Sequence, residues 1–236
     1  MFTVADGIAN VENHLPLLLV MTSIGWFFGF VQVIEAVRLG VRDRMPGQPI
    51  GMTIFLLAHD STYLMHYDYW LHSVDHWYFN ILWFGMAPSV LIELFLLSHV
   101  LRHARQQLAP QMSQTMFVVI ILLFQASAYL ILWWIQSLLS DPLYLVSLAS
   151  TNVAAVMFNI PFLIVRGNTK GQSRIFGWSA MIGPACLSFT AFVVVSPPFG
   201  THYVAAVSAV LVALSIAYLV LLEQYRRRET ADLKPQ

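Results

Sequence analysis

Long stretches of this chain are almost entirely apolar, and polar residues gather in the short segments between them. An α-helix needs about twenty predominantly apolar residues to cross a bilayer core of ~30 Å. Seven stretches of about this length lie at residues 15–36, 50–66, 79–101, 115–137, 142–165, 176–196 and 202–223. The pattern predicts an all-α integral membrane protein with seven transmembrane helices. Residues 1–236 would form a single membrane domain, with 223–236 as a polar cytoplasmic tail.

Basic residues support the seven-helix prediction. If the seven segments alternate in direction, all twelve Lys and Arg residues fall on one side: Arg38, Arg42, Arg44, Arg102, Arg105, Arg166, Lys170, Arg174, Arg226, Arg227, Arg228 and Lys234. Lys and Arg in short loops are retained on the cytoplasmic side. We therefore expect the N-terminus outside or in the lumen and the C-terminus in the cytoplasm. Since no basic residue precedes the first segment, we expect that segment, and not a cleaved signal peptide, to direct insertion.

Composition narrows the class further. Hydrophobic residues make up 58% of the chain and charged residues 10%, whereas a soluble domain carries about a quarter charged residues. A formal net charge of zero gives no reason to expect nucleic acid as a partner. The single cysteine, Cys186, excludes an intrachain disulfide and a CxxC site.

Two junctions suggest a faint internal repeat. The first segment ends in Val37-Arg38 and leads to Gly47-Gln48, and the fifth ends in Val165-Arg166 and leads to Gly171-Gln172. Both junctions would be cytoplasmic, which predicts a 3+1+3 arrangement with parallel repeats, as found among transporters. Two matching dipeptides are equally compatible with chance.

Three ionisable residues inside the apolar segments are the first catalytic candidates. They are His59 and Asp60 in the second segment and Glu93 in the third. Ionisable groups within the membrane are costly and mark functional sites by default. A desolvated carboxyl can stay protonated and act as a general acid, and His59 could serve as a base or orient Asp60. The alternative is a structural hydrogen bond or an ion pair between helices.

The predicted outer loop after the second segment holds further candidates: Asp68, His72, Asp75 and His76. These residues could position or activate a water molecule. In a helix, His72 and His76 would lie one turn apart and could hold a divalent metal. No HExxH pattern or second ligand cluster supports a metal, and an interfacial helix with Tyr and Trp at the headgroups explains the same residues. We therefore expect neither a resident metal nor a cofactor.

Aromatic residues are concentrated on the predicted outer side. Those we expect to bind substrate are Tyr63, Tyr67, Trp83, Trp133, Trp134 and Tyr203. Aromatic faces stabilise positive charge, so together with buried acids they suit a reaction that passes through a cationic intermediate. They would equally suit a planar or apolar ligand.

The order of motifs resembles the integral-membrane terpene cyclases of fungal meroterpenoid and indole-diterpene pathways, the paxilline and pyripyropene type. The residues that carry the resemblance are Gly25-Trp26, Gly51-Met52, Trp83, Arg166-Gly167-Asn168-Thr169-Lys170-Gly171-Gln172-Ser173, the stretch from Trp178 to Gly183, and Tyr218-Leu219-Val220-Leu221-Leu222. The similarity covers most of the chain in order and spacing. Its most distinctive part is the Arg-Gly…Gly-Gln-Ser segment.

The resemblance implies seven helices and a metal-independent reaction in which carboxylic acids protonate an epoxide or alkene of a polyprenyl chain. It also reveals two departures. A Trp-Glu pair of the family would fall on Tyr63-Leu64, with Asp60 one turn earlier, and a family Asp in the last segment would fall on Ser215. Neither acid is retained. Hydrolysis or oxygen-ring closure of a different epoxide therefore stands beside polyene cyclisation.

These observations predict a membrane-embedded cyclase or isomerase that opens an epoxide, or protonates an alkene, in a lipophilic isoprenoid or polyene. The partners expected are this small molecule and membrane lipid, in the endoplasmic reticulum of a eukaryote or the inner membrane of a bacterium. An epoxide hydrolase on the same scaffold is one alternative. A small-solute transporter is another, although no inner polar cluster matches the outer one. A receptor or structural protein would need no buried acids.

Overall fold

The computed structural model describes residues 2–139, 141–195 and 201–232, and side chains for all of these except 195, 201–205, 231 and 232. Within these ranges every regular element is a helix. The elements are α1 (Val4–Asn13), α2 (Leu15–Asp43), α3 (Ile50–Met65), the short π-helix η1 (Tyr69–Val74), α4 (Trp77–His103), α5 (Arg105–Leu108), α6 (Gln114–Leu139), α7 (Leu145–Arg166), α8 (Arg174–Val195) and α9 (Thr201–Asp232).

Six of these helices are long and apolar enough to cross a membrane: α2, α4, α6, α7, α8 and α9. The chain is therefore a multi-pass membrane protein. The predicted second segment corresponds to α3, which has 16 residues. At 1.5 Å per residue such a helix is ~24 Å long, shorter than a bilayer core of ~30 Å. The seventh span, the orientation and the repeat stay predictions.

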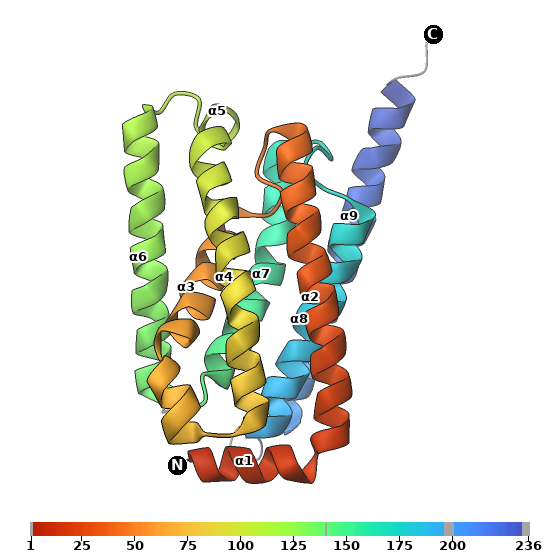
Figure 1. Ribbon diagram of the computed structural model, residues 1–236. Helices are drawn as coiled ribbons and strands as arrows, with labels where there is room; N and C mark the ends of the chain where they lie inside the picture. Colours follow the sequence, from red (N-terminus) through yellow and green to blue (C-terminus); the bar gives the residue numbers. More distant parts are fainter. Residues whose placement is uncertain (1, 140, 196–200, 233–236) are drawn as a thin grey trace.

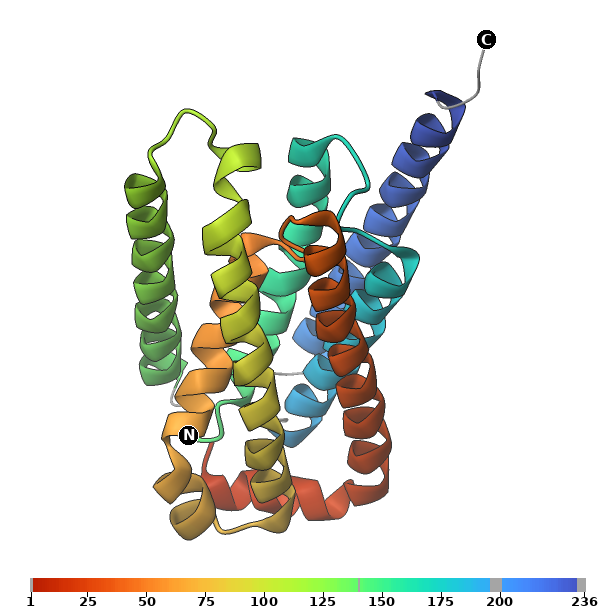
Figure 2. The ribbon, with the colours of Figure 1, turned by 45° about the horizontal axis from the view of Figure 1, so that its top comes forward.

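The long helices run side by side, and the two ends of the bundle differ (Figure 1). At one end α1 lies crosswise beneath the upright helices, next to η1. The opposite end carries α5 and the C-terminal end of α9 (Figures 1 and 2). The ends of α2, α4 and α7 also lie there, so the described Arg residues gather at this end. We call it the basic end, and we call the end with α1 the outer end after its predicted orientation.

Local sequence explains where several helices start. Thr3 and Asp6 form a capping box at the start of α1, in which the Thr3 Oγ1 accepts from the Asp6 peptide N–H. Before α7, the Asp141 carboxylate accepts from the peptide N–H groups of Leu145 (3.0 Å) and Ser147 (2.9 Å). Burial raises the pKa of Asp141, and the hydrogen bonds from Ser147 and Leu145 oppose that rise.

The connection between α2 and α3 enters the bundle from the basic end. Residues 45–49 are all buried although they are not helical. Only a glycine fits at position 47, since a Cβ there would lie 1.8 Å from the Ala36 carbonyl oxygen of α2. The absence of a side chain at Gly47 therefore lets the loop pack against α2. Irregular backbone at membrane depth is tolerated only where protein or a polar cavity surrounds it. This buried loop places Gln48 inside the protein, at the start of α3.

Candidate active site

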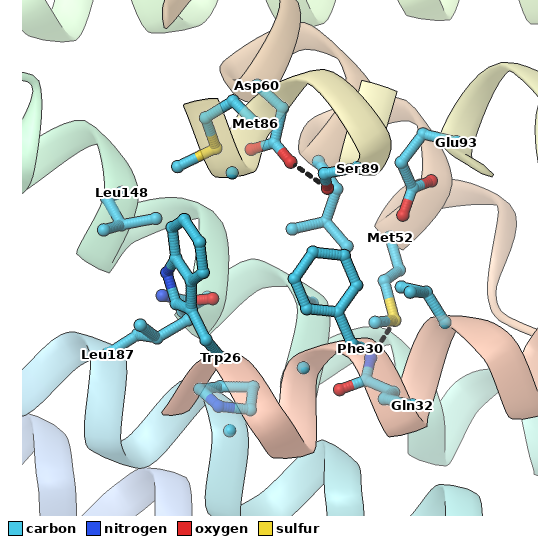
Figure 3. A pocket seen from close by; sticks show the side chains of 18 residues that line it. Trp26, Phe30, Gln32, Met52, Asp60, Met86, Ser89, Glu93, Leu148 and Leu187 are labelled. Atoms are coloured by element: carbon cyan, nitrogen blue, oxygen red, sulfur yellow. Dashed lines mark hydrogen bonds between the residues drawn. The ribbon is translucent and has the colours of Figure 1, made fainter. Parts of the chain in front are cut away.

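A cavity of about 90 Å³ lies between α2, α3, α4, α7 and α8 (Figure 3). Its apolar wall includes Trp26, Phe30, Leu148 and Leu187. Its polar lining includes Asp60, Ser89, Glu93 and Asn152. The volume suffices for the reacting part of a ligand or a few water molecules, since one water needs roughly 10–15 Å³ by this measure. The cavity cannot enclose a long isoprenoid chain.

Asp60 reaches the cavity from α3 and is held by two neighbours. The His59 Nδ1 and the Asp60 Oδ1 lie 2.9 Å apart. The Ser89 hydroxyl on α4 donates to the Asp60 Oδ2 (Figure 3). Both carboxyl oxygens of Asp60 therefore have a hydrogen-bond partner. The contact of His59 with Asp60 lies within α3, and the Ser89 hydroxyl holds the carboxyl against α4.

Glu93 is the second carboxyl of the cavity, and it is completely buried. Its partner is the Gln48 side-chain amide, whose Nε2 donates to the Glu93 Oε2 at 3.1 Å and to Oε1 at 3.4 Å. The same Nε2 donates to the Thr53 Oγ1 at 2.9 Å. Among the described residues, no Lys or Arg forms an ion pair with Glu93 or Asp60. The two carboxyls therefore differ in their partners: Glu93 accepts from an amide, whereas Asp60 contacts a histidine and a hydroxyl.

Asn152 adds an unused donor to this lining. It lies on α7 and is 4% exposed. Its Nδ2 has no hydrogen-bond partner among the described residues. A buried donor without a partner costs free energy, so a ligand oxygen in the cavity would gain a hydrogen bond at little reorganisation.

The buried loop connects Glu93 to the distinctive segment 166–173. The Arg166 Nη2 donates to the Pro46 carbonyl at 2.6 Å, and the Gln172 Nε2 donates to the Gly47 carbonyl at 3.4 Å. Gln172 in turn accepts from the Tyr218 hydroxyl of α9. This network holds the peptide groups directly before Gln48. The segment that carries the family resemblance therefore packs behind one of the two cavity carboxyls.

The structure does not bring the outer-loop candidates to this cavity. Asp68 and His72 face outwards with 78% and 70% of their side chains exposed, and their closest N–O distance is 3.8 Å. Asp75 is exposed in the left-handed conformation that ends η1. His76 bonds Glu12 of α1 at 2.9 Å. Within the described ranges, no group of three or more His, Cys, Asp or Glu residues is arranged to hold a metal.

The predicted substrate-binding aromatics also lie elsewhere. Tyr63 is buried in the core at the outer end, where it stacks on Trp70 with ring centroids 4.0 Å apart. The Trp83 indole donates to the Leu64 carbonyl and ties α4 to α3. Tyr67 and Trp134 are exposed. The side chain of Tyr203 lies outside the described residues.

Trp133 borders a different space. It is 67% exposed and lines an open cleft of about 730 Å³ between α3 and α6, together with His66, Tyr129 and Tyr144. Asp141 borders this cleft too, but its oxygens are occupied at the start of α7. The cleft therefore contributes no free acid.

Sequence reasoning missed several residues of the cavity. Gln48 follows Pro46-Gly47 and Ser89 follows Pro88, and neither belongs to a recognisable motif, so nothing in the local pattern marks them. Asn152 lies in an otherwise apolar segment, where an amide is a weak signal. Trp26 was part of the family resemblance, but its position at the cavity depends on how α2 packs against α4.

Comparison of the chain with profiles of known families, with curated proteins and with solved structures gave no match. The geometry of the cavity is therefore the basis for the functional argument, and the resemblance to membrane terpene cyclases stays an expectation from the motifs.

Proposed function

We propose that this protein is a membrane-embedded enzyme that opens an epoxide, or protonates an alkene, in a lipophilic isoprenoid or polyene substrate. The observation that carries the proposal is the placement of Asp60 and Glu93, from neighbouring helices, on one largely apolar cavity. α3 acts as a seventh span, shielded by its neighbours, with the basic end in the cytoplasm. The membrane would be the endoplasmic reticulum or a bacterial inner membrane.

Glu93 is the proton donor in this proposal. It is completely buried, and its only hydrogen-bond partner among the described residues is the Gln48 amide. An unpaired buried charge is expensive, so the neutral acid is the form available to a substrate. The Glu93 carboxyl transfers its proton to the epoxide oxygen while the C–O bond breaks. The free N–H of Asn152 would stabilise the oxygen as charge develops on it.

Asp60 accepts the proton that leaves the substrate later. In cyclisation an internal nucleophile attacks the electron-poor carbon, and the proton released passes to Asp60. In hydrolysis water attacks instead, and the Asp60–His59 pair accepts its proton. Either route is complete once a proton returns from Asp60 to Glu93. The rings of Trp26 and Phe30 face the same cavity and would stabilise positive charge on carbon.

The test uses membranes that contain the Asp60→Asn, Glu93→Gln double variant. Removing a general acid and its base typically slows a reaction by about 10²–10⁴-fold, so conversion of a panel of polyprenyl epoxides should be almost lost. The control is the Asp68→Asn, His72→Gln double variant of the outer loop, which should keep full activity. Normal turnover by the cavity variant would refute the proposal.

A small-solute transporter is the second candidate, and the buried loop 45–49 favours it. Non-helical backbone at membrane depth forms substrate and ion sites in transporters. The cavity, however, is closed towards the basic end by Gln48 and by the contacts of Arg166 with the loop. Concentration-dependent solute uptake into proteoliposomes, without chemical change of the solute, would favour transport over catalysis.

A further inference from the structure

A second space lies beside the cavity, in the outer half of the seam between α2 and α4. We call it the α2–α4 groove. Its volume is about 110 Å³, and it is lined by Leu19, Ser23 and Trp26 of α2 and by Trp77, Ile81 and Leu82 of α4. Leu19, Trp77 and Ile81 are exposed, so the groove opens on the surface that would contact lipid.

Trp26 separates the groove from the cavity, because it lines both. Its indole lies directly over Gly85 of α4, where a Cβ would come within 1.5 Å of the ring. In Figure 3 the Trp26 ring stands at the edge of the cavity, near Leu148 and Leu187. One side chain therefore divides a lipid-facing groove from the space that holds Asp60 and Glu93.

The seam on the other side of α2, towards α8, is packed through glycines. A Cβ on Gly183 of α8 would lie 3.0 Å from the Gly29 peptide nitrogen, and a Cβ on Gly25 would lie 2.8 Å from the Leu187 side chain. Small residues allow helices in membranes to approach closely. Backbone contact closes this seam at Gly183 and Gly29, and the Leu187 side chain fills it at Gly25. At the α2–α4 seam the single side chain of Trp26 stands between groove and cavity, and its rotation would join the two spaces.

The chemistry of the groove fits an apolar chain. Of its three hydroxyl groups, those of Thr22 and Tyr78 satisfy each other, since their oxygens lie 2.6 Å apart, and the third belongs to Ser23. The groove therefore offers a ligand apolar surface and aromatic edges, and it has no charge to neutralise. The acids and the free amide lie beyond Trp26, in the cavity.

We propose that the α2–α4 groove binds the apolar chain of the substrate while its reactive end lies in the cavity. The substrate then reaches Asp60 and Glu93 from the bilayer, past Trp26. This inference rests on the proposed function. It specifies the substrate class as a long-chain molecule whose reactive group is at one end, because a bulky group midway along the chain would not pass the indole.

The test is photo-crosslinking of the full chain in nanodiscs with a long straight-chain terminal epoxide that carries a diazirine in its chain. A matched probe has the same chain and diazirine but no epoxide. We expect the epoxide probe to label residues 19–26 and 77–85, identified by mass spectrometry, about tenfold more than the matched hydrocarbon. Equal labelling by both probes would mean that the groove holds only a lipid acyl chain, and would overturn the proposal.

Two variants of α2 sharpen the result. Ser23→Phe fills the groove, and labelling of the groove should fall about tenfold because overpacking is costly. Val20→Phe is the matched control, since Val20 is exposed on the same helix and does not line the groove. Equal labelling in the two variants, or labelling spread over α6, would also overturn the proposal.

Failure of this inference can be told apart from failure of the proposed function. Labelling needs binding and no turnover, so the Asp60→Asn, Glu93→Gln double variant should still be labelled in the groove. If that double variant loses activity while Ser23→Phe and Val20→Phe convert and bind the epoxide equally well, the acids act as proposed and the groove does not hold the substrate.

Discussion

The cavity around Asp60 and Glu93 and the outer loop around Asp68 and His72 contain the same kinds of side chain in different surroundings. In the cavity, each carboxyl is buried and has specific partners from another element. In the outer loop, the closest pair is 3.8 Å apart and mostly exposed. Exposed ion pairs of this type contribute ~0–1 kcal/mol to the stability of the fold. A buried polar group, in contrast, needs a hydrogen-bond partner or a functional reason for lacking one. Residue type alone therefore does not identify the reactive site; burial and partners do.

The strongest test of this contrast pairs Glu93 with Glu12. Glu93→Gln removes the proposed proton donor and should lower the rate of epoxide opening by about 10³-fold. Glu12→Gln changes only an acceptor of His76 at the outer end, so the rate should not change. The measurement is single-turnover conversion by purified protein in lipid. Comparable losses in both variants would remove the distinction between cavity and loop.

The buried loop should matter most for stability. Gly47→Ala places a Cβ against the Ala36 carbonyl oxygen, and overpacking against backbone should cost ~2–4 kcal/mol. Gly29→Ala is the matched control, because nothing lies within 4 Å of its added Cβ. Thermal unfolding in detergent, followed by near-UV circular dichroism, should show a large drop in Tm for Gly47→Ala only. A drop of similar size in both would mean that the loop is not tightly packed.

Gln48 should have an intermediate effect on activity. Gln48→Leu removes the donor to Glu93 and leaves the carboxyl without its partner, so we expect the rate to fall about tenfold. Gln136→Leu, on the border of the open cleft, should leave the rate unchanged. The pH profile of the rate separates the two explanations, because altered surroundings of Glu93 would shift it and a purely structural loss would not. An unchanged profile would show that Gln48 does not position the acid.

The smallest effect is expected at the outer end. His76→Gln weakens a contact with Glu12 that is half exposed on the glutamate side. The loss in stability should be about 0.5 kcal/mol, with no change in catalytic rate. Differential scanning fluorimetry in detergent would measure it. A loss of activity in this variant would return the outer loop to the list of candidate catalytic elements.

Part of the site could be predicted from local sequence. His59, Asp60 and Glu93 are conspicuous because each interrupts an apolar segment, and all three are buried at or beside the cavity. The outer loop was equally rich in ionisable residues, but no local pattern shows that its side chains point outwards. Tyr63 and Trp83, which we expected to bind substrate, lie outside the cavity lining: Tyr63 stacks on Trp70 in the core, and Trp83 ties α4 to α3.

The sequence by itself determined that this is an all-helical membrane protein, because about twenty consecutive apolar residues have no stable alternative to a buried or spanning helix. It also determined which helix ends carry the basic residues. Only the tertiary structure decided that Gln48 enters the bundle to meet Glu93, that Ser89 meets Asp60, and that Trp26 stands between cavity and groove. These contacts join residues from different elements, and their distances depend on how glycine positions let the helices and the buried loop approach one another.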